Sequence, residues 1–206
     1  MTPLSSSRAR CDTCHRPLAG CWCACVRRVL NPVPVLLLQH PQELRQVKNT
    51  AGLLHRCLAH VRVEVGERLQ APASTDGMAL LYPSTAADPD LPSPRAWPPP
   101  GGVQTLVVID ATWRKSRRML HLNPWLAALP RLSLVATPPS RYAIRRVRGD
   151  DQRSTLEACA LALAQLEGDD SRYLPLWEAM DAFVTLQQRL LREGRAGRDA
   201  GESTSG

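Results

Sequence analysis

Leu106-Val107-Val108-Ile109 and, directly behind it, Asp110-Ala111-Thr112-Trp113 decide the fold of this chain. The apolar run predicts a buried strand, and the helical pattern after it ends near Leu122, before Asn123-Pro124. Open α/β sheets bind ligands beyond the carboxyl ends of their strands. An acid, a hydroxyl and an indole placed there, with arginines behind them, therefore indicate chemistry on a planar, anionic substrate. The structural alternative is that Asp110 or Thr112 caps the helix and Trp113 packs on the sheet.

Strands and helices alternate along the rest of the chain. Apolar runs predict further strands at residues 33–38, 61–65, 78–82 and 132–136. Helical spacing predicts helices over residues 41–58, 154–168 and 176–192. The second of these helices opens with a capping box, Ser154 and Glu157, and closes at Gly168. This alternation is typical of a largely parallel α/β sheet, interrupted by a proline-rich surface excursion over residues 88–102.

The length of 206 residues suits one domain with a small appendage. We expect a disordered N-terminus over residues 1–9, a cysteine-rich knuckle over 10–30, the main domain over 31–193 and a disordered tail over 194–206. No apolar run approaches the roughly 18 residues of a membrane span. The first ten residues also lack the apolar region of a secretory signal. The sequence therefore predicts a cytoplasmic protein with no membrane partner.

The formal net charge is +7, and Lys48 and Lys115 are the only lysines among 26 basic residues. Codon bias explains the preference for arginine over lysine. It does not explain the excess of positive charge, which is the electrostatic footprint expected of a protein that binds nucleic acid.

Five of the seven cysteines lie between Cys11 and Cys25. Cys11-x-x-Cys14 and Cys21-x-Cys23 supply four thiolates at close spacing, as a structural zinc site requires. Cys25 is an alternative to Cys23 as the fourth ligand, and His15 is a weaker candidate. Cys57 and Cys159 fall on apolar faces of predicted helices and are expected in the core.

The motifs together resemble the DTW-domain family, the tRNA-uridine aminocarboxypropyltransferases. The similarity extends from Cys11 to about Leu191. It rests on the order and spacing of six elements: the Cys11/Cys14/Cys21/Cys23 knuckle, Gln39-His40-Pro41 with Lys48-Asn49-Thr50, Leu81-Tyr82-Pro83, Asp110-Ala111-Thr112-Trp113-Arg114-Lys115, Ser140-Arg141-Tyr142-Ala143-Ile144-Arg145-Arg146, and Ser154-Thr155-Leu156-Glu157-Ala158.

This resemblance implies that residues 31–193 form a SPOUT-like catalytic domain with a knotted C-terminal region. It also implies transfer of the 3-amino-3-carboxypropyl group of S-adenosylmethionine to a tRNA uridine, with release of 5′-methylthioadenosine. The imide nitrogen of uracil must lose its proton to become a good nucleophile, so Asp110 is the candidate base. Thr112 is expected to bind substrate or hold the carboxylate. Trp113 is expected either to stack on a base or to pack under the loop.

Two further sets of residues are candidates for binding. For the donor they are Tyr82, Pro83, Ser140, Tyr142, Arg145 (or Arg146) and Ser154. Ser154 has helix capping as its alternative role, whereas an arginine fork suits the donor's carboxylate. For RNA phosphates the candidates are Arg114, Lys115, Arg117 and Arg118. Lys48 and Asn49 either contact RNA or form a solvated helix face, and His40 is expected to cap or pack.

Two other functions fit the same sequence. A SPOUT-type RNA methyltransferase would use the same donor but release S-adenosylhomocysteine. A non-catalytic, zinc-containing RNA-binding module would need no acid at the end of the strand. No interface signature indicates the oligomeric state.

Overall fold

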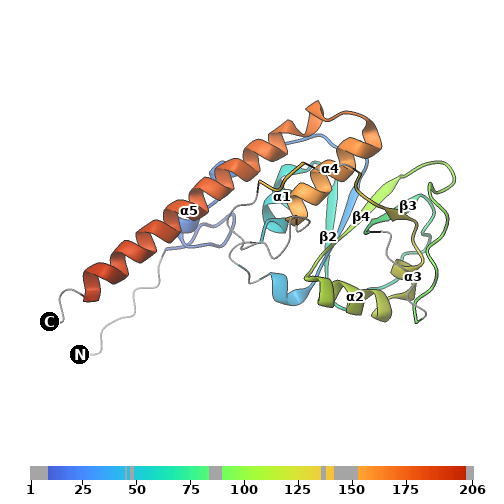
Figure 1. Ribbon diagram of the computed structural model, residues 1–206, viewed down its shortest axis with the longest axis horizontal. Coiled ribbons are helices and arrows are strands. Elements are labelled where there is room, and N and C mark those ends of the chain that lie inside the picture. Colours follow the sequence, from blue (N-terminus) through green and yellow to red (C-terminus); the bar gives the residue numbers. More distant parts are fainter. Residues whose placement is uncertain are drawn as a thin grey trace.

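The computed structural model describes residues 9–44, 46, 49–83, 90–135, 138–141 and 153–202, with the backbone alone for 194–202. At its centre is a five-stranded sheet whose paired strands are all parallel, in the order β2-β1-β4-β3-β5 (Figure 1). The strands are β1 (Val35–Gln39), β2 (Val61–Val65), β3 (Met78–Leu81), β4 (Thr105–Asp110) and β5 (Arg131–Leu132). The predicted α/β class is confirmed.

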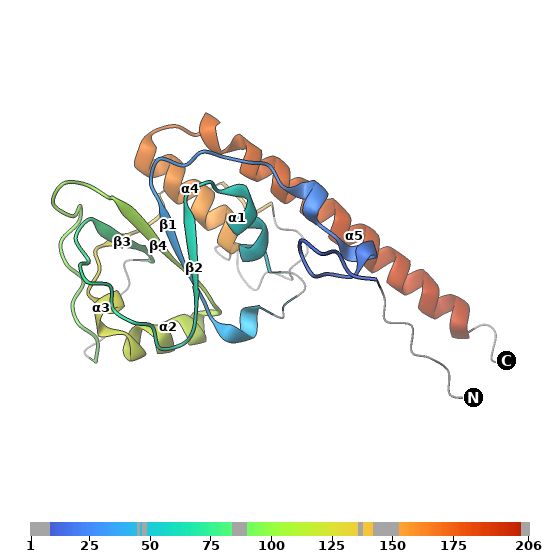
Figure 2. The same ribbon diagram turned by 180° about the vertical axis from the view of Figure 1, so that it is seen from behind.

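Helices cover both faces of the sheet (Figures 1 and 2). One face packs against α1 (Ala51–Cys57), α4 (Thr155–Glu167) and α5 (Leu174–Glu202), and the other against α2 (Trp113–Leu122) and α3 (Pro124–Ala127). In β1, Val35 and Leu37 belong to the first core, while Leu36 and Leu38 belong to the second. A strand buried on both faces needs apolar side chains at consecutive positions, which explains the unbroken run in β1.

The helix predicted over residues 41–58 is wrong as a single element. The described part consists of a short 3-10 turn, η3 (Pro41–Glu43), and then α1, which starts only at Ala51. His40 caps η3, because its Nδ1 accepts a hydrogen bond from the Gln42 backbone N–H at 3.2 Å. Asn49 Oδ1 accepts from the Ala51 N–H at 2.6 Å. Such a local side-chain bond competes with continuous helix and lets α1 begin afresh.

The strand predicted over residues 132–136 is shorter than expected, since β5 ends at Leu132. Gln165 of α4 accounts for this: its amide donates to the Ser133 carbonyl at 3.2 Å and accepts from the Val135 N–H at 3.2 Å. A side chain from a covering helix thus satisfies the backbone groups that would otherwise extend the sheet.

The predicted capping of α4 is confirmed at both ends. Ser154 and Glu157 form the reciprocal capping box, and Gly168 ends the helix in the left-handed conformation with φ of 64°. The last helix is longer than predicted, because α5 continues from Leu174 to Glu202 through part of the segment expected to be a disordered tail. Extending an existing helix costs far less free energy than nucleating a new one. The polar C-terminal end of α5 therefore continues the helix that its apolar part begins.

The N-terminal knuckle lies along α5 (Figure 2). Its two 3-10 turns, η1 (Leu18–Gly20) and η2 (Cys23–Cys25), lie one after the other along the surface of α5. Trp22 and Cys25 are buried in the first core. The knuckle therefore packs against the main domain and shares its core, instead of being connected to it only through the chain. Within the described residues, no helix combines the length and the apolar character that crossing a bilayer requires.

Candidate active site

Asp110 lies at the carboxyl end of β4, paired in register with Gln39 at the end of β1. Its side chain is 5% exposed. Oδ2 accepts hydrogen bonds from Gln39 Nε2 at 2.7 Å and from Asn49 Nδ2 at 2.6 Å, and Oδ1 accepts one from Thr155 Oγ1 at 2.6 Å. One carboxylate therefore joins β1, the start of α1 and the first turn of α4.

This hydrogen-bonded cluster explains why three separate motifs occur together. Gln39 and Asn49 belong to one motif, Asp110 to a second and Thr155 to a third, and the tertiary structure brings them to one point at the edge of the sheet. A buried carboxylate is tolerated only when it is well hydrogen-bonded. The alternative that Asp110 caps α2 is wrong, since its oxygens bond to side chains of other elements.

Thr112 and Trp113 occupy the turn between β4 and α2. Thr112 is the N-cap of α2 by position but forms no side-chain cap bond, and it is exposed. Trp113 is 53% exposed and meets Tyr82 edge-to-face at 5.5 Å between ring centroids. Trp113 therefore does not pack in the core, and its stacking on a base stays a prediction.

Tyr82 and Pro83 follow β3. Tyr82 is buried, its hydroxyl lies 3.1 Å from Ser116 Oγ, and the Arg131 guanidinium lies 5.1 Å from its ring centroid. Pro83 is exposed. The phenol thus supports α2, and its hydroxyl already has a partner within the protein.

Glu157, fully buried, does more than cap α4. Besides accepting from the Ser154 N–H at 2.9 Å, its carboxylate accepts from Ser140 Oγ at 2.9 and 3.0 Å and from the Arg141 N–H at 2.7 Å. The Arg141 guanidinium lies over the Trp177 ring of α5, 5.2 Å from its centroid. The loop around Ser140 is therefore clamped between α4 and α5. The predicted residues Tyr142, Arg145, Arg146 and Lys48 lie outside the described residues.

The four cations predicted to contact RNA differ in exposure: Lys115 is partly buried, whereas Arg114, Arg117 and Arg118 are exposed. Lys115 Nζ lies 2.6 Å from Oε1 of the buried Glu43, and Arg118 Nε lies 3.3 Å from Oε2 of Glu67. The hydrogen bond from His40 is the main cause that lowers the pKa of Glu67. Arg114 and Arg117 are exposed on the outer side of α2. Lys115 therefore holds α2 to η3 rather than facing solvent.

Replacing Lys115 with Met should destabilise the fold by about 2–3 kcal/mol, because it leaves the Glu43 carboxylate buried without a partner. Thermal or denaturant unfolding measures this loss. Arg118→Gln is the matched control: Glu67 is a third exposed at its side chain, so less than about 1 kcal/mol should be lost. Equal losses in the two variants would contradict the structural role of Lys115.

The sulfur atoms of Cys11, Cys14, Cys21 and Cys23 all lie within 4.8 Å of one another. Two of the separations are 3.7 Å, between Cys11 and Cys23, and 3.8 Å, between Cys14 and Cys21. Four sulfurs bound tetrahedrally to zinc at about 2.3 Å stand roughly 3.8 Å apart. The cluster could therefore hold a metal ion. Cys25 is buried in the core, so Cys23 rather than Cys25 completes the set.

Local hydrogen bonds prepare one of these thiols for metal binding. Backbone N–H groups, that of Cys14 first and then that of Thr13, lower the pKa of Cys11 to about 6. Desolvation is the main cause that raises the pKa of Cys23 to about 12. Cys11 is thus a thiolate at neutral pH, the form that binds metals.

Sequence reasoning missed the roles of Gln39, Thr155, Glu43 and Glu67. It considered Asn49 only as a possible RNA contact. Gln39 directly follows an apolar run and Thr155 stands inside a capping box. These positions mark a strand end and a helix start. Only their contacts with Asp110 reveal the second role.

A sequence model of the DTW domain matches residues 8–188. The chain belongs to the DTW-domain family. Within this DTW-domain family, tRNA-uridine aminocarboxypropyltransferase 2 of Drosophila melanogaster is 32% identical over 173 residues, which cover 78% of the chain and 67% of that relative. The Mus musculus protein of the same name is 28% identical over 196 residues, covering 87% of the chain and 64% of the relative.

A plant member of the DTW-domain family shares a shorter region. tRNA-uridine aminocarboxypropyltransferase A of Arabidopsis thaliana is 33% identical over 139 residues, covering 56% of the chain and 52% of the relative. The chain thus spans about two thirds of the length of the animal relatives and about half that of the plant relative. No solved structure matches the chain.

Proposed function

We propose that this protein transfers the 3-amino-3-carboxypropyl group of S-adenosylmethionine to a uridine of tRNA. The observation that carries the proposal is the convergence of Gln39, Asn49 and Thr155 on the Asp110 carboxylate. This convergence occurs in a DTW-domain chain whose relatives are named tRNA-uridine aminocarboxypropyltransferases.

The donor, when bound, supplies a carbon activated by the adjacent sulfonium. A bond forms between that carbon and N3 of uracil, the carbon–sulfur bond breaks, and the electron pair leaves with 5′-methylthioadenosine. The protein's task is to hold the two substrates in line and to take up the N3 proton, a contribution typically worth about 10²–10⁴-fold. No nucleophilic side chain is required.

Asp110 is our proposed proton acceptor, and Oδ1 is the atom. Among the described residues, Oδ2 accepts two hydrogen bonds from amide groups, whereas Oδ1 accepts one, from the Thr155 hydroxyl. A carboxylate oxygen has two lone pairs, so Oδ1 can accept a proton without displacing Gln39 or Asn49. Trp113, half-exposed beside this edge of the sheet, is placed to stack on the uracil ring.

Main-chain groups are the principal donor-binding elements in this proposal. The hydroxyls of Tyr82, Ser140 and Ser154 bond to Ser116 or Glu157, so they have less capacity for a ligand. The loops after β3, β4 and β5 end at the same edge of the sheet, where open α/β folds bind ligands. Pro83 and the Ser140 loop would line the donor site, with Arg145 or Arg146 as the proposed fork for the donor's carboxylate.

Zinc is the metal we propose for the cysteine cluster, since an all-thiolate tetrahedral set is typical of structural zinc. Its role would be to order a knuckle too short to form its own core. We also propose the SPOUT-like, knotted path, which the all-parallel sheet supports. The part of the chain that would form the knot includes residues 142–152, which lie outside the described residues. A cytoplasmic location fits a tRNA substrate and free cysteines.

The test is an assay of the purified protein with S-adenosylmethionine and unmodified tRNA transcript. We expect 3-(3-amino-3-carboxypropyl)uridine in the digested RNA, detected by mass spectrometry, and an equal amount of 5′-methylthioadenosine. Release of S-adenosylhomocysteine with a methylated base would show a methyltransferase instead. Absence of both products with RNA binding retained would favour a non-catalytic module.

A further inference from the structure

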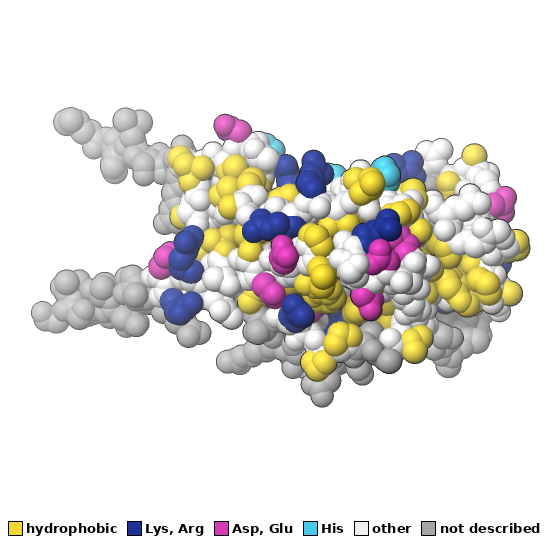
Figure 3. Space-filling model, turned by 90° about the horizontal axis from the view of Figure 1, so that it is seen from above, with side chains coloured by type: hydrophobic (Ala, Val, Ile, Leu, Met, Phe, Trp, Pro, Cys, Tyr) yellow, Lys and Arg dark blue, Asp and Glu magenta, His cyan; other side chains and the backbone are white. Residues whose placement is uncertain are grey.

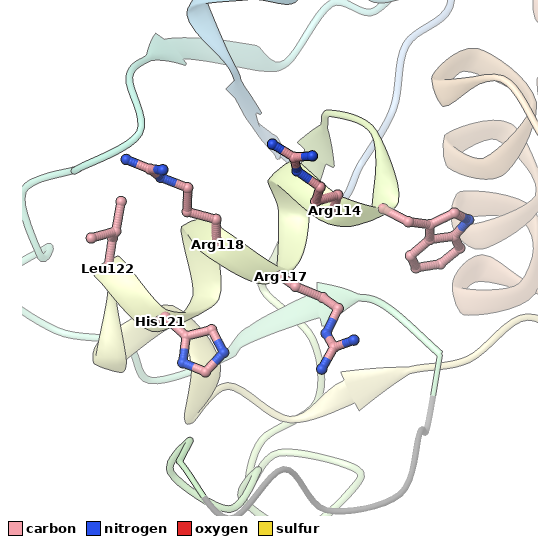
Figure 4. A pocket seen from close by; sticks show the side chains of 6 residues that line it. Arg114, Arg117, Arg118, His121 and Leu122 are labelled. Carbon is pink, nitrogen blue, oxygen red and sulfur yellow. The ribbon is translucent and has the colours of Figure 1, made fainter.

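The outer face of α2 consists of Arg114, Arg117, Arg118 and His121, all exposed. Their spacing of three, four and seven residues places their positions on one face of the helix, from which the side chains point in two directions (Figure 4). Trp113 stands at one end of this row and Leu122 at the other, and the six side chains line an open hollow of about 660 Å³ (Figure 4). No carboxylate lies among these six residues.

The cations of the outer face are unfavourable for the stability of α2 itself. Arg114 and Arg117 stand in the first turns of α2, near the positive end of the helix dipole, and no acidic residue stands in the first turn. Arg114 and Arg118 also point to the same side of α2, at a spacing of four residues where like charges repel (Figure 4). An arrangement that opposes local stability is typical of a functional surface.

Several arginines on or against α5 pair with acids. On α5, Arg189 pairs with Glu193, while Arg141 and Arg27 pair with Asp181 and Glu178 of that helix. Figure 3 shows the same mixture on the face seen from above, where basic and acidic side chains lie side by side. Among the residues that the structure describes, Arg114 has no ion pair, and Arg118 keeps 68% of its side chain exposed despite its bond to Glu67.

The directions of the side chains exclude a single small anion as the partner. Arg114 and Arg118 point to one side of α2, while Arg117 and His121 point to the other (Figure 4). These groups do not converge on one point; they are spread over seven residues, about 10 Å of helix. A spread row of cations beside an exposed indole fits an extended polyanion that carries aromatic bases.

We infer that the outer face of α2 is the surface on which the phosphate backbone of the RNA substrate lies. Arg114 and Arg117 contact phosphates, and Trp113, three residues after Asp110, receives the base at the end nearest the reaction. Lys115 is not part of this surface, because it is bonded to Glu43. The inference rests on the proposed function for the identity of the RNA.

Salt dependence of binding is the direct test. The Kd for unmodified tRNA transcript is measured at several salt concentrations for the wild type, Arg114→Gln and Arg114→Gln/Arg117→Gln. Each lost phosphate contact should lower the slope of log K against log salt by about one, so the double variant should lose about two. The melting temperature of Arg114→Gln should stay the same or rise, which loss of a merely structural contact would not produce.

Arg189→Gln/Arg192→Gln removes the same charge from α5 and serves as the matched control. The inference is supported if only the α2 variants lose slope. It is overturned if both double variants lose the same slope, or if neither does. Product formation by the wild type is followed in parallel: product with unchanged slopes refutes only the surface, whereas tRNA binding with no product refutes the proposed reaction.

Discussion

Asp110→Asn should lower the rate of aminocarboxypropyl transfer by about 10²–10⁴-fold while leaving the fold almost intact. The geometry makes this separation possible. An asparagine oxygen in place of Oδ2 can still accept from Gln39 and Asn49, and its amide nitrogen in place of Oδ1 can donate to the Thr155 hydroxyl. The three hydrogen bonds persist, but the charge that accepts the uracil proton is lost. Single-turnover product formation measures the effect.

Asp110→Ala is the informative companion. It removes the acceptor of one buried donor, Gln39, and of two partly buried donors, Asn49 and Thr155. A buried donor without a partner costs about 1–3 kcal/mol, so this variant should unfold at a clearly lower temperature than Asp110→Asn. If Asp110→Asn retains more than a tenth of wild-type activity, the carboxylate is not the base. Asp110 would then have only a structural role, in which its hydrogen bonds connect β1, α1 and α4.

Removing the metal should produce the largest loss of stability. Structural zinc in short peptides contributes an apparent 10–16 kcal/mol of binding free energy near pH 7, and in this protein part of it would stabilise the contact between the knuckle and α5. We expect Cys21→Ser, or exhaustive chelation, to abolish stoichiometric zinc and to lower the melting temperature by roughly 10 °C or more, at about 2–4 °C per kcal/mol. Metal analysis and calorimetry measure the two effects.

Cys25→Ala is the control for this experiment, because Cys25 belongs to the same motif but packs in the core. It should retain one zinc per chain and lose only a small packing contribution. If Cys25→Ala loses the metal while Cys21→Ser retains it, the ligand assignment is wrong. A wild-type protein purified without metal, whose melting curve does not change on adding zinc, would refute the site.

Much of the fold follows from local pattern. The short apolar runs at Val35–Leu38 and Leu106–Ile109 predict strands covered on both faces, and nearly all of their consecutive side chains are buried. The start of α4 at Ser154 and its end at Gly168 follow from side-chain capping and backbone chirality, which are local effects. The cysteine cluster belongs to the same class, since its ligands are close in sequence.

Contacts between distant residues were decided by the tertiary structure alone. Gln165 shortens the strand predicted over 132–136 by bonding to the backbone of Ser133 and Val135. Asp110 meets Gln39 and Thr155, and Lys115 meets Glu43, across 71, 45 and 72 residues. Periodicity records which face of an element is buried. It does not record which polar side chains form hydrogen bonds between elements, because a hydrogen bond between distant residues depends on how whole elements pack.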